Sequence, residues 1–299
     1  MKRYVRTWAS AACLLTVLLN AGCRGLGTGA TAITDPPPSQ THVFMVVEEN
    51  RPYSQVIGAA TIMPYLNSLA TKYGLATQYY ADFHPSIPNY FMLTTGQPES
   101  FLDNTFQGPV TDDNIVRELV NANKTWHCYA ESLPSVGYTG GDVYPYVKHH
   151  NPFAYFSDVI GTSQANNIVP FTQFSTDLAS GTFPDFSFII PNQLDNSHNG
   201  SAGVADQWLQ INIDPLIQSS GFQQDGLLII VFDESLFTDL QHGGGHIAWV
   251  VIGPKVKNGY QSTTFYQHES TLRLILSTLG VSTFPGAASS APDMGEFFQ

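Results

Sequence analysis

Leu227-Leu228-Ile229-Ile230-Val231-Phe232 is an uninterrupted apolar run, and Asp233-Glu234 follows it directly. Continuous hydrophobicity of this kind is typical of a strand buried on both faces, as in a parallel sheet covered by helices. Similar runs occur at residues 42–47, 186–190 and 247–252, and helical patterns occur at residues 63–73, 89–95, 112–121, 205–217 and 270–279. We expect Asp112 or Asp113 to cap the third helix. The alternation predicts an α/β fold with a three-layer, doubly wound and mostly parallel sheet.

Polar residues follow three of these runs at the point where each strand should end. Glu49 and Asn50 follow the first run, Asp195 and His198 follow residues 186–190, and Asp233-Glu234 follows the run quoted above. In open α/β sheets the ligand site lies beyond the carboxyl ends of the strands. Burial of a core does not require this pattern, so we expect a functional site at that edge.

The N-terminal segment has the features of an export signal. Three basic residues precede an apolar run over residues 8–19 that is too short to span a bilayer, and small residues lead to Cys23. The segment Leu19-Asn20-Ala21-Gly22-Cys23 resembles the lipoprotein cleavage box, which predicts a lipid tether at Cys23 in the periplasm or cell envelope. Simple secretion, with Cys23 an ordinary residue, is the alternative. Residues 24–40 read as a disordered linker and residues 41–299 as a single domain.

Charge and cysteine content exclude several classes of function. Removal of the signal leaves 9 basic and 24 acidic residues, a net charge of −15. Such a balance argues against nucleic-acid binding and against electrostatic docking on anionic membranes. Cys128 is the one cysteine outside the leader, which excludes an internal disulfide and a thiolate metal cluster. A metal would have to be held by oxygen and nitrogen ligands.

The segment His84-Pro85-Ser86-Ile87-Pro88-Asn89-Tyr90 contains the candidate nucleophile. Pro88 can start a short helix, which places the Ser86 hydroxyl at a turn near free backbone N–H groups that favour a phosphate oxygen. A serine hydroxyl is weakly nucleophilic until a base or a metal activates it. Taken alone, Ser86 would more often be a cap or turn residue.

Five motifs in order give a more specific signal than any one of them. They are Glu49-Asn50-Arg51-Pro52-Tyr53, residues 84–96, residues 146–153, Pro191-Asn192 with residues 195–199, and Asp233-Glu234-Ser235. Together they resemble the bacterial phosphoesterases that include acid phosphatases and phosphatidylcholine-type phospholipases C, within the alkaline phosphatase superfamily. The resemblance spans Val43 to Leu279. Relatives often carry Asp-Met-His-Asp where this chain has Asn196-Ser197-His198-Asn199, so one metal ion is expected and a second remains open.

The resemblance implies an alkaline-phosphatase-like fold and a role for each motif. Ser86 would be the nucleophile, and Glu49, Asn50, Asp233 and Glu234 would bind a divalent cation beside it. This oxygen-rich set suits calcium, magnesium, manganese or zinc without choosing among them.

Further site residues are predicted around this centre. We expect Asn89 to donate its amide to a phosphate oxygen, and Asp195 to orient His198 for phosphate contact or leaving-group protonation. A structural Asp195–His198 pair and a second metal site are the alternatives. His150 and His246, the latter after Gly243-Gly244-Gly245, complete the catalytic candidates. His268 is expected to be structural, and His42 and His127 to be ordinary strand residues.

Three functions follow from these expectations. The leading one is hydrolysis of small phosphate monoesters through a phosphorylated Ser86. A phospholipase C or another phosphodiesterase would use the same site, but such relatives tend to carry threonine as nucleophile and additional C-terminal domains. A non-catalytic surface protein that keeps the fold would show no metal-dependent hydrolysis.

Overall fold

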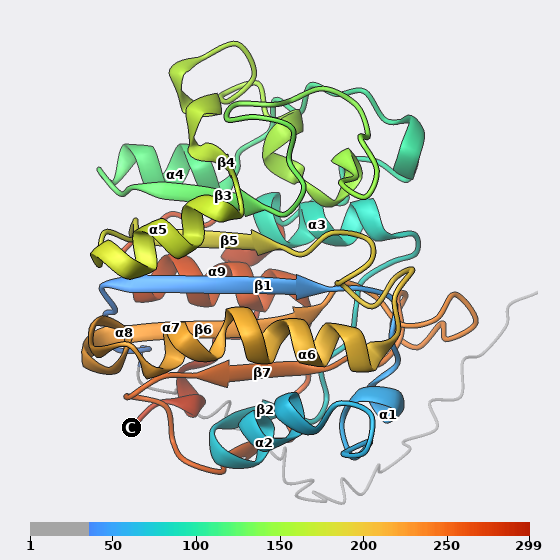
Figure 1. Cartoon of the computed structure of the whole chain (residues 1–299), viewed down its shortest axis with the longest axis vertical. Helices are drawn as coiled ribbons and strands as arrows, with labels where there is room; N and C mark the ends of the chain where they lie inside the picture. Colours follow the sequence, from blue (N-terminus) through green and yellow to red (C-terminus); the bar gives the residue numbers. More distant parts are fainter. Residues whose placement is uncertain (1–35) are drawn as a thin grey trace, which may run out of the picture. The chain divides into compact units, whose positions relative to one another are not determined.

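The apolar run 227–232 lies in strand β6 (Gly226–Phe232), at the centre of the molecule. The computed structural model describes residues 36–299, and all seven residues of β6 are buried in it. Strand β6 pairs in parallel with β1 (His42–Glu48) along its whole length, and β5 (Phe186–Ile190) pairs in parallel with the other side of β1. Three of the predicted strands therefore form the middle of one sheet (Figure 1).

The complete sheet has eight strands in the order β4-β3-β5-β1-β6-β7-β2-β8. The remaining strands are β2 (Gly74–Ala76), β3 (Trp126–Ala130), β4 (Ile168–Pro170), β7 (Trp249–Ile252) and β8 (Gln261–Ser262). Strand β7 runs antiparallel to both β6 and β2. Its connection from β6 contains no helix, and a parallel partner usually requires a helical crossover. The sheet is thus mostly parallel, as predicted.

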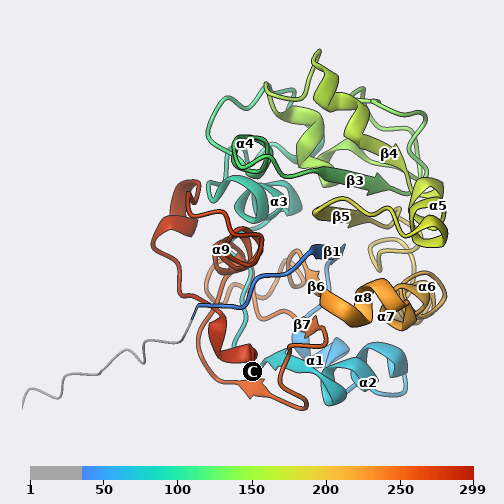
Figure 2. The ribbon, with the colours of Figure 1, turned by 90° about the vertical axis from the view of Figure 1, so that its left-hand side faces the viewer.

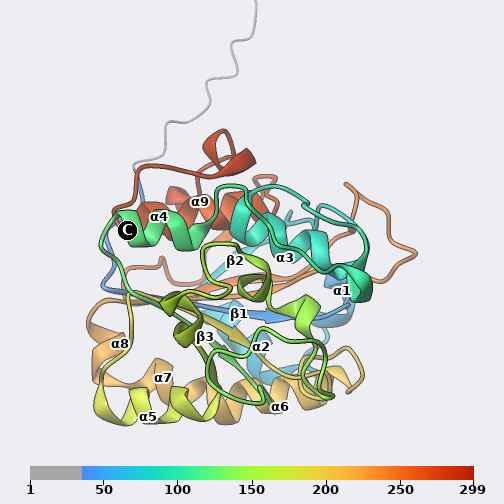
Figure 3. The same ribbon diagram turned by 90° about the horizontal axis from the view of Figure 1, so that it is seen from above.

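Helices cover both faces of the sheet and make three layers. Figures 2 and 3 show α3 (Ser86–Thr95), α4 (Ile115–Asn121) and α9 (His268–Thr278) on one face. The other face carries α2 (Pro64–Lys72), α5 (Thr172–Ser180), α6 (Ala202–Asn212), α7 (Asp214–Gln218) and α8 (Ser220–Asp225), while α1 (Tyr53–Val56) is a single turn after β1. The predicted three-layer α/β fold is confirmed.

Two helical expectations need correction. The cap of α4 is Asn114, whose side-chain oxygen accepts hydrogen bonds from the backbone N–H groups of Val116 and Arg117, so the prediction of Asp112 or Asp113 is wrong. The predicted helix over residues 205–217 is two helices, α6 and α7. Pro215 lacks an N–H group and fits only the first turn of a helix, so a new helix starts there.

The export signal, its lipoprotein box and most of the predicted linker lie outside the described residues. The last two linker residues are attached to the domain, because Gln40 donates its backbone N–H to the Thr278 carbonyl and Lys255 donates to the Ser39 carbonyl. Within residues 36–299, no helix has the length and apolarity needed to cross a membrane.

Candidate active site

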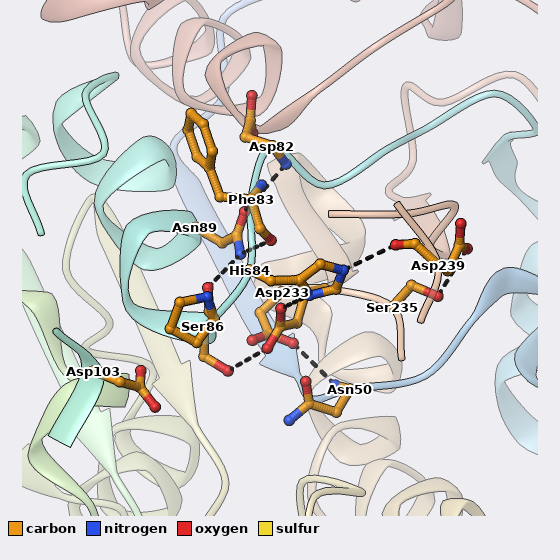
Figure 4. A network of polar contacts seen from close by, with 12 residues as sticks. Asn50, Asp82, Phe83, His84, Ser86, Asn89, Asp103, Asp233, Ser235 and Asp239 are labelled. Carbon is orange, nitrogen blue, oxygen red and sulfur yellow. Dashed lines mark hydrogen bonds and ion pairs between the residues drawn. The ribbon is translucent and has the colours of Figure 1, made fainter. Parts of the chain in front are cut away.

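The carboxyl edge of the sheet gathers the residues that the sequence predicted for it. Glu49 follows β1, Asp233 and Glu234 follow β6, and Ser86 is the first residue of α3. All four side chains are buried. Figure 4 shows Ser86, Asp233 and Asn50 facing one small region from three separate segments of the chain.

The Ser86 hydroxyl faces two carboxylates. Its Oγ lies 3.2 Å from Glu49 Oε2 and 3.0 Å from Glu234 Oε1. One hydroxyl proton serves only one of these acceptors at a time. The third carboxylate, Asp233, accepts the backbone N–H of Asn50 at Oδ1, and within the described residues its Oδ2 has no hydrogen-bond partner.

Burial and neighbouring carboxylates raise the pKa values of Glu49 and Asp233. Burial, and then the neighbouring Asp233, raise the pKa of Glu49 well above its ordinary value. Burial and Glu234 raise the pKa of Asp233 to about 8. Buried carboxylates this close are stable only with a proton or a cation between them.

This donor set fits a divalent cation by its chemistry. Hard cations prefer carboxylate and amide oxygens, and the unpartnered Asp233 Oδ2 is one such ligand atom. Nevertheless, in the part of the chain that the structure describes, no three His, Cys, Asp or Glu side chains form a ready-made metal site. One carboxylate oxygen of Glu234 contacts His84, and one of Glu49 accepts the Tyr90 hydroxyl.

His84 is a site residue that the sequence reasoning did not assign. Its Nε2 donates to the Asp239 carbonyl at 2.9 Å, and its Nδ1 contacts Glu234 Oε2. Both ring nitrogens thus face oxygen atoms that can accept a hydrogen bond, an arrangement that favours the protonated ring. Burial opposes this charge, but the hydrogen bonds to Glu234 and to the Asp239 carbonyl raise the pKa of His84. Its position two residues before Ser86 was the available signal.

Tyr90 was also missed. Its hydroxyl donates to Glu49 Oε1 at 2.6 Å, and its ring stacks on that of His150 at 5.2 Å. Tyr90 lies one helical turn after Ser86, so it projects from the same face of α3. This spacing could have been used to find it.

His150 lies against Glu49 and Tyr90, and His198 lies next to His150. His150 is buried with Nε2 3.1 Å from Glu49 Oε1, the distance of an ion pair but without hydrogen-bond alignment. Burial, and then His149 and His198, lower the pKa of His150 well below its ordinary value. His198 is exposed, and its ring lies 6.1 Å from that of His150. Their catalytic roles stay predictions.

The prediction for Asn89 needs correction. Its side-chain oxygen accepts the backbone N–H groups of Asp82 and Phe83, and its amide nitrogen donates to the carbonyls of Phe83 and Pro85. The amide is therefore fully used in holding the loop that carries His84 and Ser86, as Figure 4 shows. It has no donor left for a phosphate.

The start of α3 also offers fewer backbone donors than expected. The Ile87 N–H already donates to Asp103 Oδ1 at 3.2 Å, and Pro88 has no N–H group. A bound phosphate must therefore be neutralised mainly by other groups.

Asp195 does not orient His198. Its carboxyl faces Glu131 instead, where burial, and to a smaller extent a hydrogen bond to Asp195, raise the pKa of Glu131. His198 is oriented by its neighbour, since Nδ1 lies 2.8 Å from the side-chain oxygen of Asn199. The Asp195–His198 pair predicted from the spacing is wrong, because the turn sends the two side chains in different directions.

His246 lies outside the first layer of the site. Its ring stacks on Tyr53 at 4.2 Å and on Tyr80 at 4.8 Å, and its Nε2 donates to the Thr77 carbonyl. Among the described residues it makes no hydrogen bond to Ser86 or to the three carboxylates. In this structure His246 packs between aromatic rings, and its catalytic role stays a prediction. His268 is structural as expected, with Nε2 donating to the Asp233 carbonyl.

The preceding glycines do allow a close backbone approach. A Cβ on Gly244 would overlap the Phe83 carbonyl oxygen and meet Ala81 Cβ at 2.6 Å. The loop before β7 thus packs directly on the segment that leads to Ser86. A side chain at this position would displace that segment.

The sequence is similar to known phosphatases. The model of the Phosphoesterase family matches residues 59–282, which include Ser86, Asp233 and Glu234 but begin after Glu49. The phosphatidylinositol-3-phosphatase of Mycobacterium tuberculosis is 31% identical over 276 residues, covering 91% of this chain and 86% of that protein. The phosphate-repressible acid phosphatase of Penicillium chrysogenum is 27% identical, and the match covers 89% of this chain and 71% of that protein. An acid phosphatase of Aspergillus fumigatus is 31% identical, and the match covers 71% of this chain and 50% of that protein.

Solved structures bear on the fold. A protein in the alkaline phosphatase superfamily from Vibrio parahaemolyticus superposes with a TM-score of 0.62 at 16% identity, covering 87% of this chain and 72% of that chain. The lipoteichoic acid synthase LtaP from Listeria monocytogenes superposes with a TM-score of 0.56 at 13% identity, covering 82% of this chain and 73% of that chain. At these identities the likeness concerns the fold alone.

Proposed function

The chain belongs to the Phosphoesterase family, and we propose that it hydrolyses phosphate monoesters by way of a phosphorylated Ser86. Hydrolysis of phosphoric esters follows from the family. The preference for monoesters, the serine intermediate and the metal are the proposal. The observation that carries it is the buried Ser86 hydroxyl, which lies 3.2 Å and 3.0 Å from two carboxylate oxygens.

Glu49, Asn50, Asp233 and Glu234 are the residues that would hold a divalent cation. When bound, such an ion lowers the pKa of a serine hydroxyl and neutralises a phosphate oxygen. Charge supports this assignment, since a phosphate would otherwise face three carboxylates beside a helix start with few free donors. Arg51 does not help, because its guanidinium donates to Ser197 and to the Gly200 carbonyl.

The proposed hydrolysis has two steps, transfer of the phosphoryl group to Ser86 and its release to water. Ser86 Oγ attacks phosphorus and its proton passes to Glu49 or Glu234, while the bond from phosphorus to the leaving oxygen breaks. His84 keeps Glu234 in place by its ion pair. His198 supplies the proton that the leaving oxygen takes up, and His150 lies beside it. Water then attacks the phosphoserine, which releases inorganic phosphate and restores the Ser86 hydroxyl.

The test compares three substrates with the purified protein: phenyl phosphate, diphenyl phosphate and phosphatidylcholine. We expect turnover of the monoester, loss of that turnover with a chelator, and loss in Ser86→Ala. Ser68→Ala, at an exposed position on α2, is the matched control. A preference for the diester or the lipid would replace the monoester assignment by a phosphodiesterase, and full activity of Ser86→Ala would exclude the nucleophile.

A further inference from the structure

Five exposed apolar side chains gather on the two segments that flank the site. Phe237 is 76% exposed and Leu240 70%, and Leu236 lies beside them; on the other segment Phe101 is 52% and Leu102 63% exposed. We call these five residues the apolar rim. Resting on the proposed function, we propose that the apolar rim binds the leaving group, so that the substrates are phosphates of neutral aryl or long-chain alkyl alcohols.

The apolar rim is attached to the nucleophile through direct contacts. The Phe237 ring lies 5.4 Å from the ring of His84, which contacts Glu234, and Glu234 lies 3.0 Å from Ser86 Oγ. The Phe101 ring packs edge-on against Phe83 at 5.2 Å. Phe237 is thus connected to Ser86 through His84 and Glu234, and Phe101 through Phe83, so a leaving group that extends from phosphorus over His84 or Phe83 would meet these rings.

The two segments approach Ser86 from different sides. Figure 4 shows Asp103 of residues 97–110 and Asp239 of residues 235–242 on opposite sides of Ser86 and His84. Asp103 accepts the Ile87 N–H, and the Asp239 carbonyl accepts from His84. Each segment is thus fastened to the loop that carries the nucleophile.

The charge of the segments selects among leaving groups. Neither residues 97–110 nor residues 235–242 contain a lysine or arginine, but they carry Glu99, Asp103 and Asp239. Further phosphate or carboxylate groups on the leaving group would meet these acids and no lysine or arginine of the two segments. A neutral apolar group instead removes apolar surface from water on both sides.

The loop that presents Phe237 is preorganised. The Asp239 carboxylate accepts from the Ser235 hydroxyl and from the His246 N–H, both at 3.0 Å, and from the Gln241 N–H. A rigid loop binds an apolar group at a smaller entropic cost. Single exposed apolar residues are ordinary on protein surfaces, whereas a cluster beside a reactive group indicates a binding surface.

Linear alkyl phosphates from ethyl to octyl test the proposal, because chain length changes apolar area with little change in leaving-group chemistry. We expect kcat/KM of the wild-type protein to rise with chain length. In Phe237→Ala the ratio of octyl to ethyl kcat/KM should fall by about tenfold, the effect of losing roughly half of a buried aromatic contact. Leu240→Ala should lower the ratio less. Ile211→Ala, 62% exposed near the far end of α6, should leave it unchanged.

Two further arms separate the outcomes. Calorimetry with ethyl- and octylphosphonate measures the same preference without turnover, so that absence of all hydrolysis would overturn the proposed function while binding still tests the apolar rim. If Phe237→Ala lowers hydrolysis only of phosphatidic acid in phosphatidylcholine vesicles, the apolar chain comes from a lipid in a bilayer. If it also lowers hydrolysis of monomeric octyl phosphate, the apolar chain belongs to a free substrate. A flat wild-type series, or a ratio unchanged in Phe237→Ala, would overturn the inference.

Discussion

At the scale of single residues, the site holds three buried carboxylates whose mutual repulsion favours the binding of a cation. Glu49, Asp233 and Glu234 are buried together, and His84 contacts one of them, Glu234. Core packing alone would favour apolar side chains at these positions, because buried carboxylates that lack partners lower stability. This loss of folding stability is expected if the three carboxylates serve to bind a cation, which in turn binds a phosphate.

Asp233→Asn should stabilise the protein in the presence of a chelator while abolishing hydrolysis. The pKa of Asp233 is raised to about 8 in the fold, so the folded state binds a proton more tightly than the unfolded state. Stability is consequently lost as the pH rises from about 4 toward 8, and asparagine removes this loss. We expect a gain of about 1–4 kcal/mol in the free energy of unfolding at pH 7.

Urea unfolding between pH 4 and pH 8 measures this effect. The difference between Asp233→Asn and the wild-type protein should grow across that range. A difference independent of pH, or a less stable variant at pH 7, would show that Asp233 is not under repulsion.

At the scale of elements, the nucleophile is positioned by a glycine loop and by Asn89. Gly244→Ala should push the backbone at Phe83 away, because its Cβ would overlap the Phe83 carbonyl oxygen. We expect a loss of about 1–3 kcal/mol in the free energy of unfolding, typical of overpacking, together with a fall in kcat. Gly141→Ala is the matched control, since a Cβ there has open space around it.

Urea midpoints and kcat, measured on both glycine variants, check this prediction. If Gly244→Ala behaved like Gly141→Ala in both measurements, the close approach of the two loops would not position Ser86.

Periodicity and strand ends predicted the elements that carry the site. Residues 227–232 and 43–47 are apolar throughout, so both their burial and the acids after them were readable from the sequence. The direction of β7 and the course of the turn at Asp195 depend on loop geometry, which short sequence patterns do not specify. Asn89 was misassigned because an amide suits a phosphate and a loop equally well, and only the structure shows which it contacts.

At the scale of the whole molecule, a formal net charge of −12 makes cation binding a question of stability as well as catalysis. A divalent cation that binds only the folded state raises the free energy of unfolding by about 2.7 kcal/mol at a concentration of 100 times its Kd. Thermal unfolding should therefore shift upward with added divalent cation. Sodium chloride at equal ionic strength controls for general screening of the negative charge.

The same titration on Glu49→Gln and Asp233→Asn locates the effect. Both variants should lose most of the shift in Tm. An equal shift in the wild-type protein, in both variants and in sodium chloride would mean that the stabilisation comes from surface charge and not from this site.

The role of Ser86 can be tested by stopping turnover of a phosphate monoester with acid and identifying the phosphorylated peptide by mass spectrometry. We expect one phosphoryl group on the peptide that contains Ser86, and none in the Ser86→Ala variant. Phosphate recovered on another residue, or steady hydrolysis by Ser86→Ala, would contradict it.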